Sequence, residues 1–345
     1  MSREEYAGAV ALTGFGTYVP DQTVSGAEIA ERSGVPEDVV TEKMGLRRKH
    51  VCPAEADHCS DMCVEAGREA LADAGVDPDE VDLVLYHGSE YKDHVVWSAA
   101  ADIAERLGCT EAFATESYSL CAGAPIAIRQ VKAQLLADHV DTVLLVTASR
   151  EEDLIDYDNE RSSFMFNFGS GASAMVLESA AEPGRVRAHL HESAAITDGS
   201  FSRDVVMPAG GSARPASAET VQHGLHTLDV PDQQGMKERL AEVSLPNFRE
   251  VAETAMARSG VEDVDFVALT HMKRSFHELV CEELGCDPGS ESYYLDDYGH
   301  VQSADQILAL SEGLDRGLVA SGDSVLFLAA GTGYTWAATC LTWRS

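Results

Sequence analysis

Short apolar runs separated by amphipathic stretches make up most of the chain. The longest runs, residues 143–148 and 325–330, have the length of a buried β-strand and fall well short of the ~20 residues of a transmembrane helix. The stretches between such runs are Ala-rich and have the apolar spacing of amphipathic helices. Strands that alternate with helices in this way predict an α/β fold built from parallel βαβ units.

Part of this pattern occurs twice. Residues 70–86 and 257–270 each run from the end of an Ala-rich helix through a glycine turn and an acidic connection into a β-branched strand. Residues 107–123 and 284–304 form a second pair: each starts with Leu-Gly-Cys at a helix end and passes through Glu-Ser-Tyr to a small-residue turn and a new helix. We therefore expect an internal duplication.

The duplication predicts two equivalent α/β halves, residues 1–180 and residues 181–345. A pseudo-twofold axis between such halves brings equivalent loops face to face. Cys121 of the first half is therefore expected close to His300 of the second half. His271 directly follows the strand of the second repeat, so it is expected at the same edge of the structure.

These three residues have the chemistry of a nucleophile site. Cys121 lies among small residues in SLCAGAP, directly before an Ala-rich helix, and the positive end of a helix dipole favours a thiolate. His271 is suited to stabilise a thioester oxyanion or to move a proton. His300 stands at the matching helix start of the second half. The sequence thus predicts covalent catalysis through Cys121.

Composition and charge exclude several function classes. The net charge of -33 argues against nucleic acid, because a phosphate-binding face needs clustered Lys and Arg. The chain starts without the apolar segment of a secretory signal, so we expect a cytoplasmic protein without a membrane partner. The eight cysteines form neither a CxxC pair nor a zinc spacing, and we expect no metal site.

Several segments together resemble one known family. They are GFGTYVP and GLRRKH near the N-terminus, SLCAGAP around Cys121, FNFGSGASAMVL at 166–177, and GTGYTWAA at 331–338. Over nearly its whole length the chain resembles β-ketoacyl-ACP synthase III and related condensing enzymes. The resemblance implies a five-layered αβαβα thiolase fold, a homodimer, and acyl transfer through a cysteine thioester. It also implies acyl carrier protein or CoA thioesters as partners, with no cofactor.

One catalytic position departs from the family pattern. Cys121 and His271 match the usual Cys-His-Asn set, but His300 stands where the family has Asn. Asn can only donate from its amide at this position, whereas histidine can also act as a base. Cys-His-His is the set of the elongating ketosynthases, so we favour C–C condensation. Relatives with an altered third residue transfer acyl groups to oxygen or nitrogen, and this alternative stays open.

The resemblance also implies substrate-binding residues. These are Lys43, Arg48, Glu90, Val96, Trp97, Lys273, Gly331 and Gly333. Val39 stands where the family has an adenine-stacking Trp, which favours an ACP-bound donor over CoA. The basic cluster Arg47, Arg48, Lys49 and His50 is interpreted as a docking surface for an acidic carrier, or as a cluster folded against the protein's own carboxylates.

The loop at residues 88–97 is longer than the family's usual one. In that fold it crosses the dimer interface, so Glu90 or Asp93 could supply a carboxylate to the partner, as in enzymes of the hydroxymethylglutaryl-CoA synthase type. The alternative is a polar interface loop. A further alternative for the whole chain is a catalytically silent partner subunit, but such subunits lose the nucleophile and this chain keeps Cys121.

Overall fold

The computed structural model describes residues 10–137 and 140–344. Its first half contains β1 (Ala11–Tyr18), α3 (Cys59–Ala74), β4 (Leu83–Gly88), α4 (Ala99–Leu107), β5 (Phe113–Tyr118), α5 (Gly123–Leu136), β6 (Thr142–Ser149) and β7 (Gly171–Glu178). Its second half contains β8 (Ala188–Thr197), α7 (Gln233–Ser259), β9 (Phe266–Leu269), α8 (Arg274–Glu283), α9 (Asp305–Asp315), β10 (Ser324–Gly331) and β11 (Thr335–Trp343).

The strand order shows the duplication directly. The order is β5-β4-β6-β7-β1-β8-β11-β10-β9, and β1 pairs with β8 where the two halves meet. In the first half β4 and β6 are parallel while β7 runs antiparallel to β6. In the second half β9 and β10 are parallel while β11 runs antiparallel to β10. The same connectivity therefore occurs on both sides of the β1–β8 junction.

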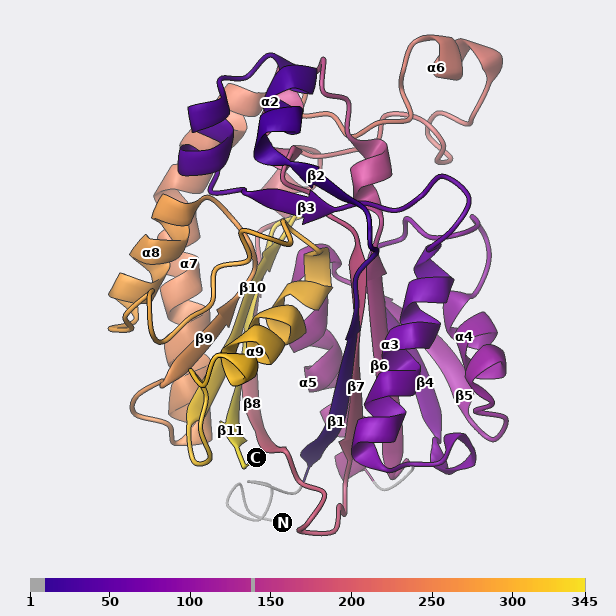
Figure 1. Cartoon of the computed structure of the whole chain (residues 1–345), viewed down its shortest axis with the longest axis vertical. Helices are drawn as coiled ribbons and strands as arrows, with labels where there is room; N and C mark the ends of the chain where they lie inside the picture. The colour runs from indigo at the N-terminus through magenta and orange to yellow at the C-terminus, as the bar shows by residue number, and fades with distance from the viewer. Residues whose placement is uncertain (1–9, 138–139, 345) are drawn as a thin grey trace.

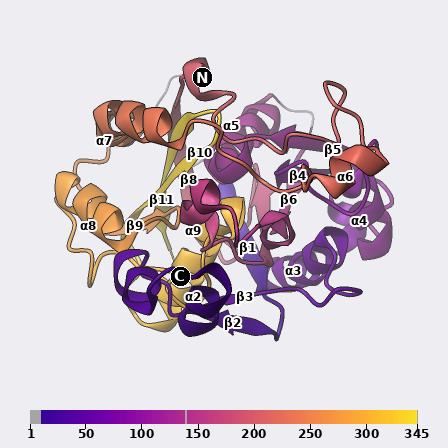
Figure 2. The ribbon, with the colours of Figure 1, turned by 90° about the horizontal axis from the view of Figure 1, so that it is seen from above.

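The helices form three layers around the strands of the two halves. Helices α5 and α9 lie between the halves and share one hydrophobic core with both (Figure 1). Helices α3 and α4 cover the outer face of the first half, and α7 and α8 cover that of the second (Figure 2). This arrangement confirms the predicted five-layered αβαβα thiolase fold.

Burial on both faces explains the unbroken apolar runs. Every residue of β6 and β7 is buried, because helices cover both sides of these strands. Helix α3 lies so close to β1 that a Cβ at Gly14 or Gly16 would overlap the helix backbone. No helix within residues 10–137 and 140–344 is long and apolar enough to cross a bilayer.

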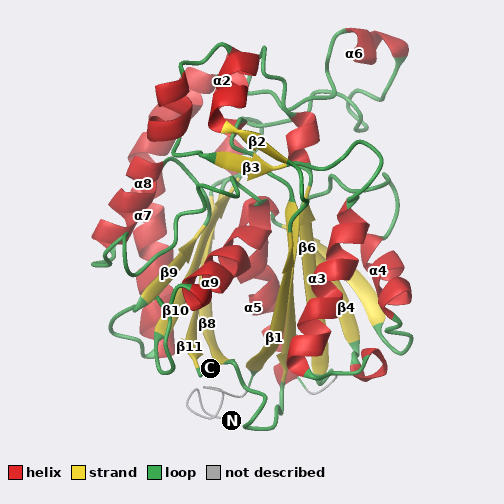
Figure 3. Ribbon diagram, viewed as in Figure 1, coloured by secondary structure: helices red, strands yellow, loops and turns green. Residues whose placement is uncertain are grey.

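Additional segments cover the end of the molecule where the parallel strands have their carboxyl ends (Figure 3). A small sheet of β2 (Thr23–Ser25) and β3 (Arg48–His50) lies there with α2 (Gly26–Ser33). The long connection between β8 and α7 carries the short helix α6 (Ala218–Gln222), which projects from the body (Figure 1). The candidate site lies beneath this end, where the catalytic loops of the two halves meet.

Candidate active site

Cys121 lies on a tight turn between β5 and α5. The turn is a single 3₁₀ turn, Leu120–Ala122, and Leu120 adopts φ 49°, in the left-handed region that non-glycine residues seldom occupy. The second half repeats this geometry, since Gln302 has φ 52° at the start of a 3₁₀ turn that leads into α9. Backbone strain of this kind persists where the surrounding structure fixes it, often at functional sites.

Gly331, at the end of β10, lies against this turn. A Cβ at Gly331 would lie 3.0 Å from the Cys121 backbone nitrogen and 2.9 Å from that of Ala122. Only glycine therefore fits beside the backbone of the nucleophile. Gly331 therefore lies beside the nucleophile, whereas Gly333 lies in the following turn with open space where a Cβ would be. That either glycine binds substrate stays a prediction.

Cys121 and His300 are in direct contact. The Cys121 Sγ lies 3.0 Å from His300 Nε2, which confirms the proximity predicted from the duplication. On the other side of the ring, His300 Nδ1 lies 2.6 Å from Asp305 Oδ2. All three side chains are buried, and Asp305 is fully enclosed. A thiol, an imidazole and a carboxylate thus form a continuous hydrogen-bonded chain.

Two backbone hydrogen bonds hold Asp305, the last group of this hydrogen-bonded series. Its Oδ1 accepts a hydrogen bond from the Val301 backbone N–H (2.7 Å), and its Oδ2 also accepts one from the His271 backbone N–H (2.7 Å). Asp305 is the first residue of α9, where the helix dipole favours a negative charge. Burial alone would lower the pKa of His300, but the charges of Asp305 and Cys121 outweigh burial and raise it well above its usual value.

His271 has the opposite electrostatic character. Burial, together with the nearby His300, lowers the pKa of His271 well below its ordinary value, so the ring is neutral. The Asn167 Nδ2 amide donates to His271 Nδ1 over 2.9 Å, which places the ring proton on Nε2. Among the described residues no group pairs with this buried Nε2. It is therefore free to donate a hydrogen bond to a substrate oxygen.

The three candidate catalytic side chains share one cavity of about 400 Å³. Phenylalanines dominate its walls, namely Phe164, Phe168, Phe248 and Phe276. Helix α7 contributes one helical face, including Leu240, Ala241 and Ser244. A mostly apolar cavity of this size with a few convergent polar groups is typical of a small-molecule or cofactor-arm site.

The lysines of the chain divide into two groups. Lys49, Lys92 and Lys132 have buried side chains that donate to oxygens of the protein. Lys43, Lys237 and Lys273 are exposed, and within the described ranges no ion pair involves them. Lys237 and Lys273 line the cavity, and Lys43 adjoins Met44, which also lines it. The exposed lysines therefore gather at the Cys121 cavity.

The proposed docking role of the basic cluster is wrong for Lys49. Its side chain is fully buried, and its Nζ donates to the carbonyl oxygens of Phe166 (3.0 Å) and Phe168 (2.5 Å). Burial lowers the pKa of Lys49 to about 8. His50 is half-buried with its Nδ1 against the Pro20 carbonyl. Lys49 instead fixes the segment that carries Asn167 and Phe168.

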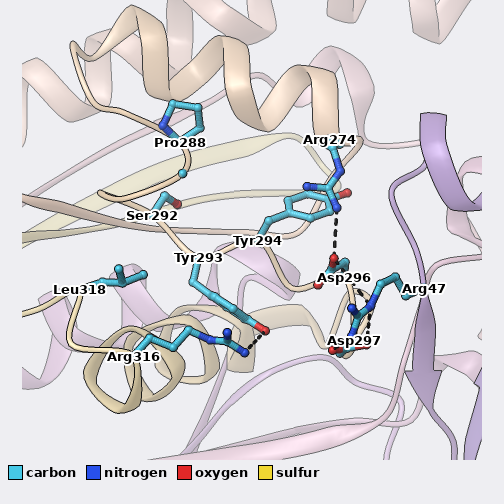
Figure 4. Close-up of a pocket in the computed structure, with 11 residues that line it drawn as sticks. Arg47, Arg274, Pro288, Ser292, Tyr293, Tyr294, Asp296, Asp297, Arg316 and Leu318 are labelled. Carbon is cyan, nitrogen blue, oxygen red and sulfur yellow. Dashed lines mark hydrogen bonds and ion pairs between the residues drawn. The ribbon is translucent and has the colours of Figure 1, made fainter.

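The two arginines of the cluster are exposed but already paired with carboxylates. Arg47 pairs with Asp297 (Figure 4). The Nε of Arg48 lies 3.3 Å from the same carboxylate. Arg47 lines a surface hollow of about 490 Å³, in which Arg274 also pairs with Asp296 (Figure 4). The alternative interpretation of the cluster, folded against the protein's own carboxylates, therefore fits. Arg48 is not among the residues that line the Cys121 cavity.

The loop at residues 88–97 lies apart from the Cys121 cavity of its own chain. Glu90 and Val96 are exposed, and Trp97 packs partly against the outer core. Asp93 is bound within its own chain, since its carboxylate accepts from the Ser60 backbone N–H (3.1 Å) and hydroxyl (2.5 Å). Asp93 therefore caps α3 in its own chain, and the role of Glu90 or Asp93 in a partner's site stays a prediction.

Two residues of the site were missed from sequence. An aspartate in the first turn of a helix, such as Asp305, usually indicates only a helix start. The duplication did carry a signal, however. It aligns Asp305 at the start of α9 with Gly123 at the start of α5, so one half has a carboxylate where the other has none. Asn167 lies inside a glycine-rich segment that resembled the family motif and drew attention to its glycines instead.

Comparison with known proteins agrees with this site and fold. The model of 3-oxoacyl-[acyl-carrier-protein] synthase III matches residues 117–199, and its C-terminal model matches residues 255–343. The β-ketoacyl-[acyl-carrier-protein] synthase III of Desulfitobacterium hafniense is 28% identical over 342 residues, covering 97% of this chain and 98% of the relative.

Solved structures show the same fold. The 3-oxoacyl-[acyl-carrier-protein] synthase III of Aquifex aeolicus superposes with a TM-score of 0.82 at 20% identity, covering 97% of this chain and all of the other. The OleA protein of Xanthomonas campestris, solved with lauric acid and lauroyl-CoA, gives 0.80 at 17% identity, covering 97% and 99%. With its duplicated fold and both family models matched, this chain belongs to the thiolase-superfamily condensing enzymes of the 3-oxoacyl-[acyl-carrier-protein] synthase III type and is an acyltransferase.

Proposed function

We propose that Cys121 receives the acyl group of an acyl-carrier-protein or CoA thioester and holds it as a covalent thioester. The observation that carries this proposal is the contact of 3.0 Å between Cys121 Sγ and His300 Nε2, with Asp305 2.6 Å from the other ring nitrogen. His300 takes the Sγ proton, Asp305 stabilises the resulting imidazolium, and His271 donates to the thioester oxygen.

The loading step then follows with balanced atoms. Sγ attacks the thioester carbonyl carbon, and the carbonyl oxygen becomes an oxyanion that accepts from His271 Nε2–H. The bond between this carbon and the carrier sulfur breaks, and His300 returns its proton to the departing thiol. Incubating the protein with acetyl, butyryl and octanoyl thioesters of ACP and CoA tests this step. An acyl mass shift on the peptide that contains Cys121 is the expected result, and an unmodified peptide with every donor rejects the proposal.

We propose that the donor is bound to a carrier protein that docks over Lys43, Lys237 and Lys273. Val39 is aliphatic and offers no ring on which an adenine could stack, which disfavours CoA. The relatives are named for acyl carrier protein, and an acidic carrier would be repelled by most of a chain with net charge -33. Exposed lysines at the cavity supply the local attraction that such a partner needs.

Charge reversal at these lysines tests carrier docking. We expect Lys237→Glu or Lys273→Glu to raise KM for an ACP-bound donor by about three- to tenfold at low salt, since steering depends on local charge. Added salt should shrink the difference, because surface charges are screened. The matched control is Arg68→Glu on the outer helix α3, where Arg68 is exposed and pairs only with Glu65 in the described chain. A KM no different from that of this control would contradict the docking surface.

We propose a homodimer formed along β5. This strand ends the sheet, and it exposes Phe113 and Tyr118 at 52% and 41%. In the loop between β4 and α4, Val95 and Val96 are almost entirely exposed, and Val96 has φ 53°, an outlier for a β-branched residue. An unpaired edge strand that exposes two aromatic rings invites pairing with a second copy.

Sedimentation velocity measures this association. We expect the wild type to sediment as a dimer and the double variant Val95→Asp/Val96→Asp to shift to monomer, because a buried unpaired carboxylate opposes association. Leu279→Asp, which places a carboxylate at an exposed leucine of α8, is the control and should stay dimeric. A dimeric double variant would exclude this loop from the interface.

A further inference from the structure

We propose that the Tyr334 hydroxyl selects acyl groups that carry an oxygen on the second or third carbon, counted from the thioester carbonyl. The inference rests on the proposed loading of Cys121 and names the class of acyl donor that the same site prefers. It depends on what holds the Tyr334 ring, on the polar atom that the ring presents, and on the part of the cavity in which that atom lies.

Tyr334 is a fixed part of the cavity wall. It lies in the turn between β10 and β11, and it lines the cavity that contains Cys121. Its backbone N–H donates to the Asp198 carbonyl (3.0 Å), and its own carbonyl accepts from the Asp198 N–H (2.9 Å). The ring packs edge-on against Phe201, with the ring centres 5.5 Å apart, and its centre lies 5.7 Å from that of Trp336. These contacts hold the hydroxyl at a defined place.

Among residues 10–137 and 140–344, none forms a hydrogen bond with the Tyr334 hydroxyl. Burial raises the pKa of Tyr334 well above its ordinary value, and the charge of Cys121 raises it further. The phenol therefore keeps its proton and lies within electrostatic reach of Sγ. A hydroxyl without a partner in an apolar cavity is costly, and a substrate oxygen that pairs with it removes that cost.

The position of Tyr334 in the cavity indicates which part of the substrate it meets. The exposed Lys237 and Lys273 mark the rim, the proposed side of carrier docking. Tyr334 instead packs on two buried aromatic rings, so its part of the wall backs onto the protein interior. An acyl group on Cys121 extends from Sγ away from the departing carrier. Its first carbons after the carbonyl therefore pass closest to Tyr334.

This arrangement distinguishes oxygenated acyl groups from plain ones. The phenylalanine walls contact an alkyl chain but form no hydrogen bond with an oxygen on it. The Tyr334 hydroxyl can donate to an oxo or hydroxyl oxygen and can also accept from a hydroxyl. A plain alkyl group leaves Tyr334 unpaired, and a site built in this way discriminates against the analogue that lacks the oxygen.

Removing the hydroxyl alone tests this selection. Tyr334→Phe keeps the ring and its packing. Loading of Cys121 is followed by quenched mass measurements with butyryl-ACP, 2-hydroxybutyryl-ACP and 3-hydroxybutyryl-ACP, using both enantiomers of each hydroxy acid. We expect the wild type to load the best hydroxybutyryl donor about five- to tenfold faster than butyryl at equal, low concentration, as one hydrogen bond allows. Tyr334→Phe should load butyryl normally and lose this preference.

Tyr18→Phe is the matched control. The Tyr18 hydroxyl donates to Asp57 (2.8 Å) and lies outside the described lining of the cavity, so this variant should keep the wild-type preference. A preference that survives in Tyr334→Phe, or a wild type that loads butyryl as fast as every hydroxybutyryl donor, would overturn the inference. So would an unchanged loading preference combined with slower transfer from loaded Tyr334→Phe to malonyl-ACP, because the hydroxyl would then serve the acceptor.

Equilibrium binding decides the question even if no donor loads. Cys121→Ala cannot form the thioester, so calorimetry with the S-acylpantetheines of the same acids reports selection alone. The best hydroxybutyryl ligand should bind about fivefold more tightly than the butyryl ligand, and the difference should vanish when Tyr334→Phe is added. Equal Kd values in Cys121→Ala contradict the inference. Selective binding without loading of the wild type by any donor would reject the proposed function alone.

Discussion

Replacing Cys121 with alanine is expected to abolish acyl loading completely. The substitution removes the atom that forms the thioester, while His271, His300 and Asp305 keep their other hydrogen bonds. The side chain is buried in a turn of small residues, so alanine should be accommodated with the fold intact. Intact mass after incubation with acyl donors measures loading, and circular dichroism and sedimentation check the fold and assembly.

A second buried cysteine provides the control. All eight cysteines are free and buried, but Cys109 lies at the end of α4, remote from the cavity lining, and burial raises its pKa to about 11. Cys109→Ala should therefore load like the wild type. If Cys121→Ala still gains the acyl mass, another group is the nucleophile and the roles of His271 and His300 have to be reassigned.

The duplication is the part of the sequence that predicted the site best. Two stretches of matching pattern implied equivalent loops, and the structure places Leu120 and Gln302 at equivalent turns with nearly the same φ. Because the turns face each other across the pseudo-twofold axis, a residue just before one of them reaches the side chain in the other. That relation is a property of topology, so it could be predicted without knowing any side-chain contact.

The same symmetry shows why only one of the two equivalent positions has a reactive centre. Ser303 is the counterpart of Cys121, and its hydroxyl lies 3.1 Å from His87 Nδ1 and 2.8 Å from Thr147 Oγ1. A Cβ at Gly88 or Gly123 would approach the same hydroxyl within 2.7 or 2.9 Å. Ser303 is thus enclosed by packed groups, whereas Cys121 opens into a cavity.

Residues whose roles depend on distant contacts could not be predicted. Lys49 is one of four consecutive basic residues, a pattern that predicts an exposed segment. Its side chain is nevertheless buried and donates to the carbonyls of Phe166 and Phe168. Asp305 accepts from residues on two different loops, one of them 34 positions away. Local sequence reports propensity and periodicity, but it does not report which backbone groups a buried charge will meet.

The hydrogen bond between Asn167 and His271 also joins distant parts of the sequence, so it could not be predicted either. It orients the ring whose removal should have the second large effect on activity. Replacing His271 with alanine is expected to lower both loading and transfer by about 10²–10³-fold, because each step passes through an oxyanion that this ring stabilises. The His271 ring is neutral, since burial keeps its pKa well below the ordinary value. The loss should therefore be the same throughout the neutral pH range.

Asn167→Leu distinguishes the hydrogen bond that His271 donates from the contact that orients the His271 ring. Leucine removes the amide that fixes the proton on Nε2 but leaves the His271 ring in the cavity, so only the preference between tautomers is lost. A net hydrogen bond is worth about 1 kcal/mol, which corresponds to about a fivefold loss of rate. Quenched-flow mass measurements of loading and of turnover would resolve the two variants. If His271→Ala loads and turns over nearly as fast as the wild type, the oxyanion must be stabilised elsewhere, and the backbone N–H of Cys121 beside Gly331 is then the candidate donor.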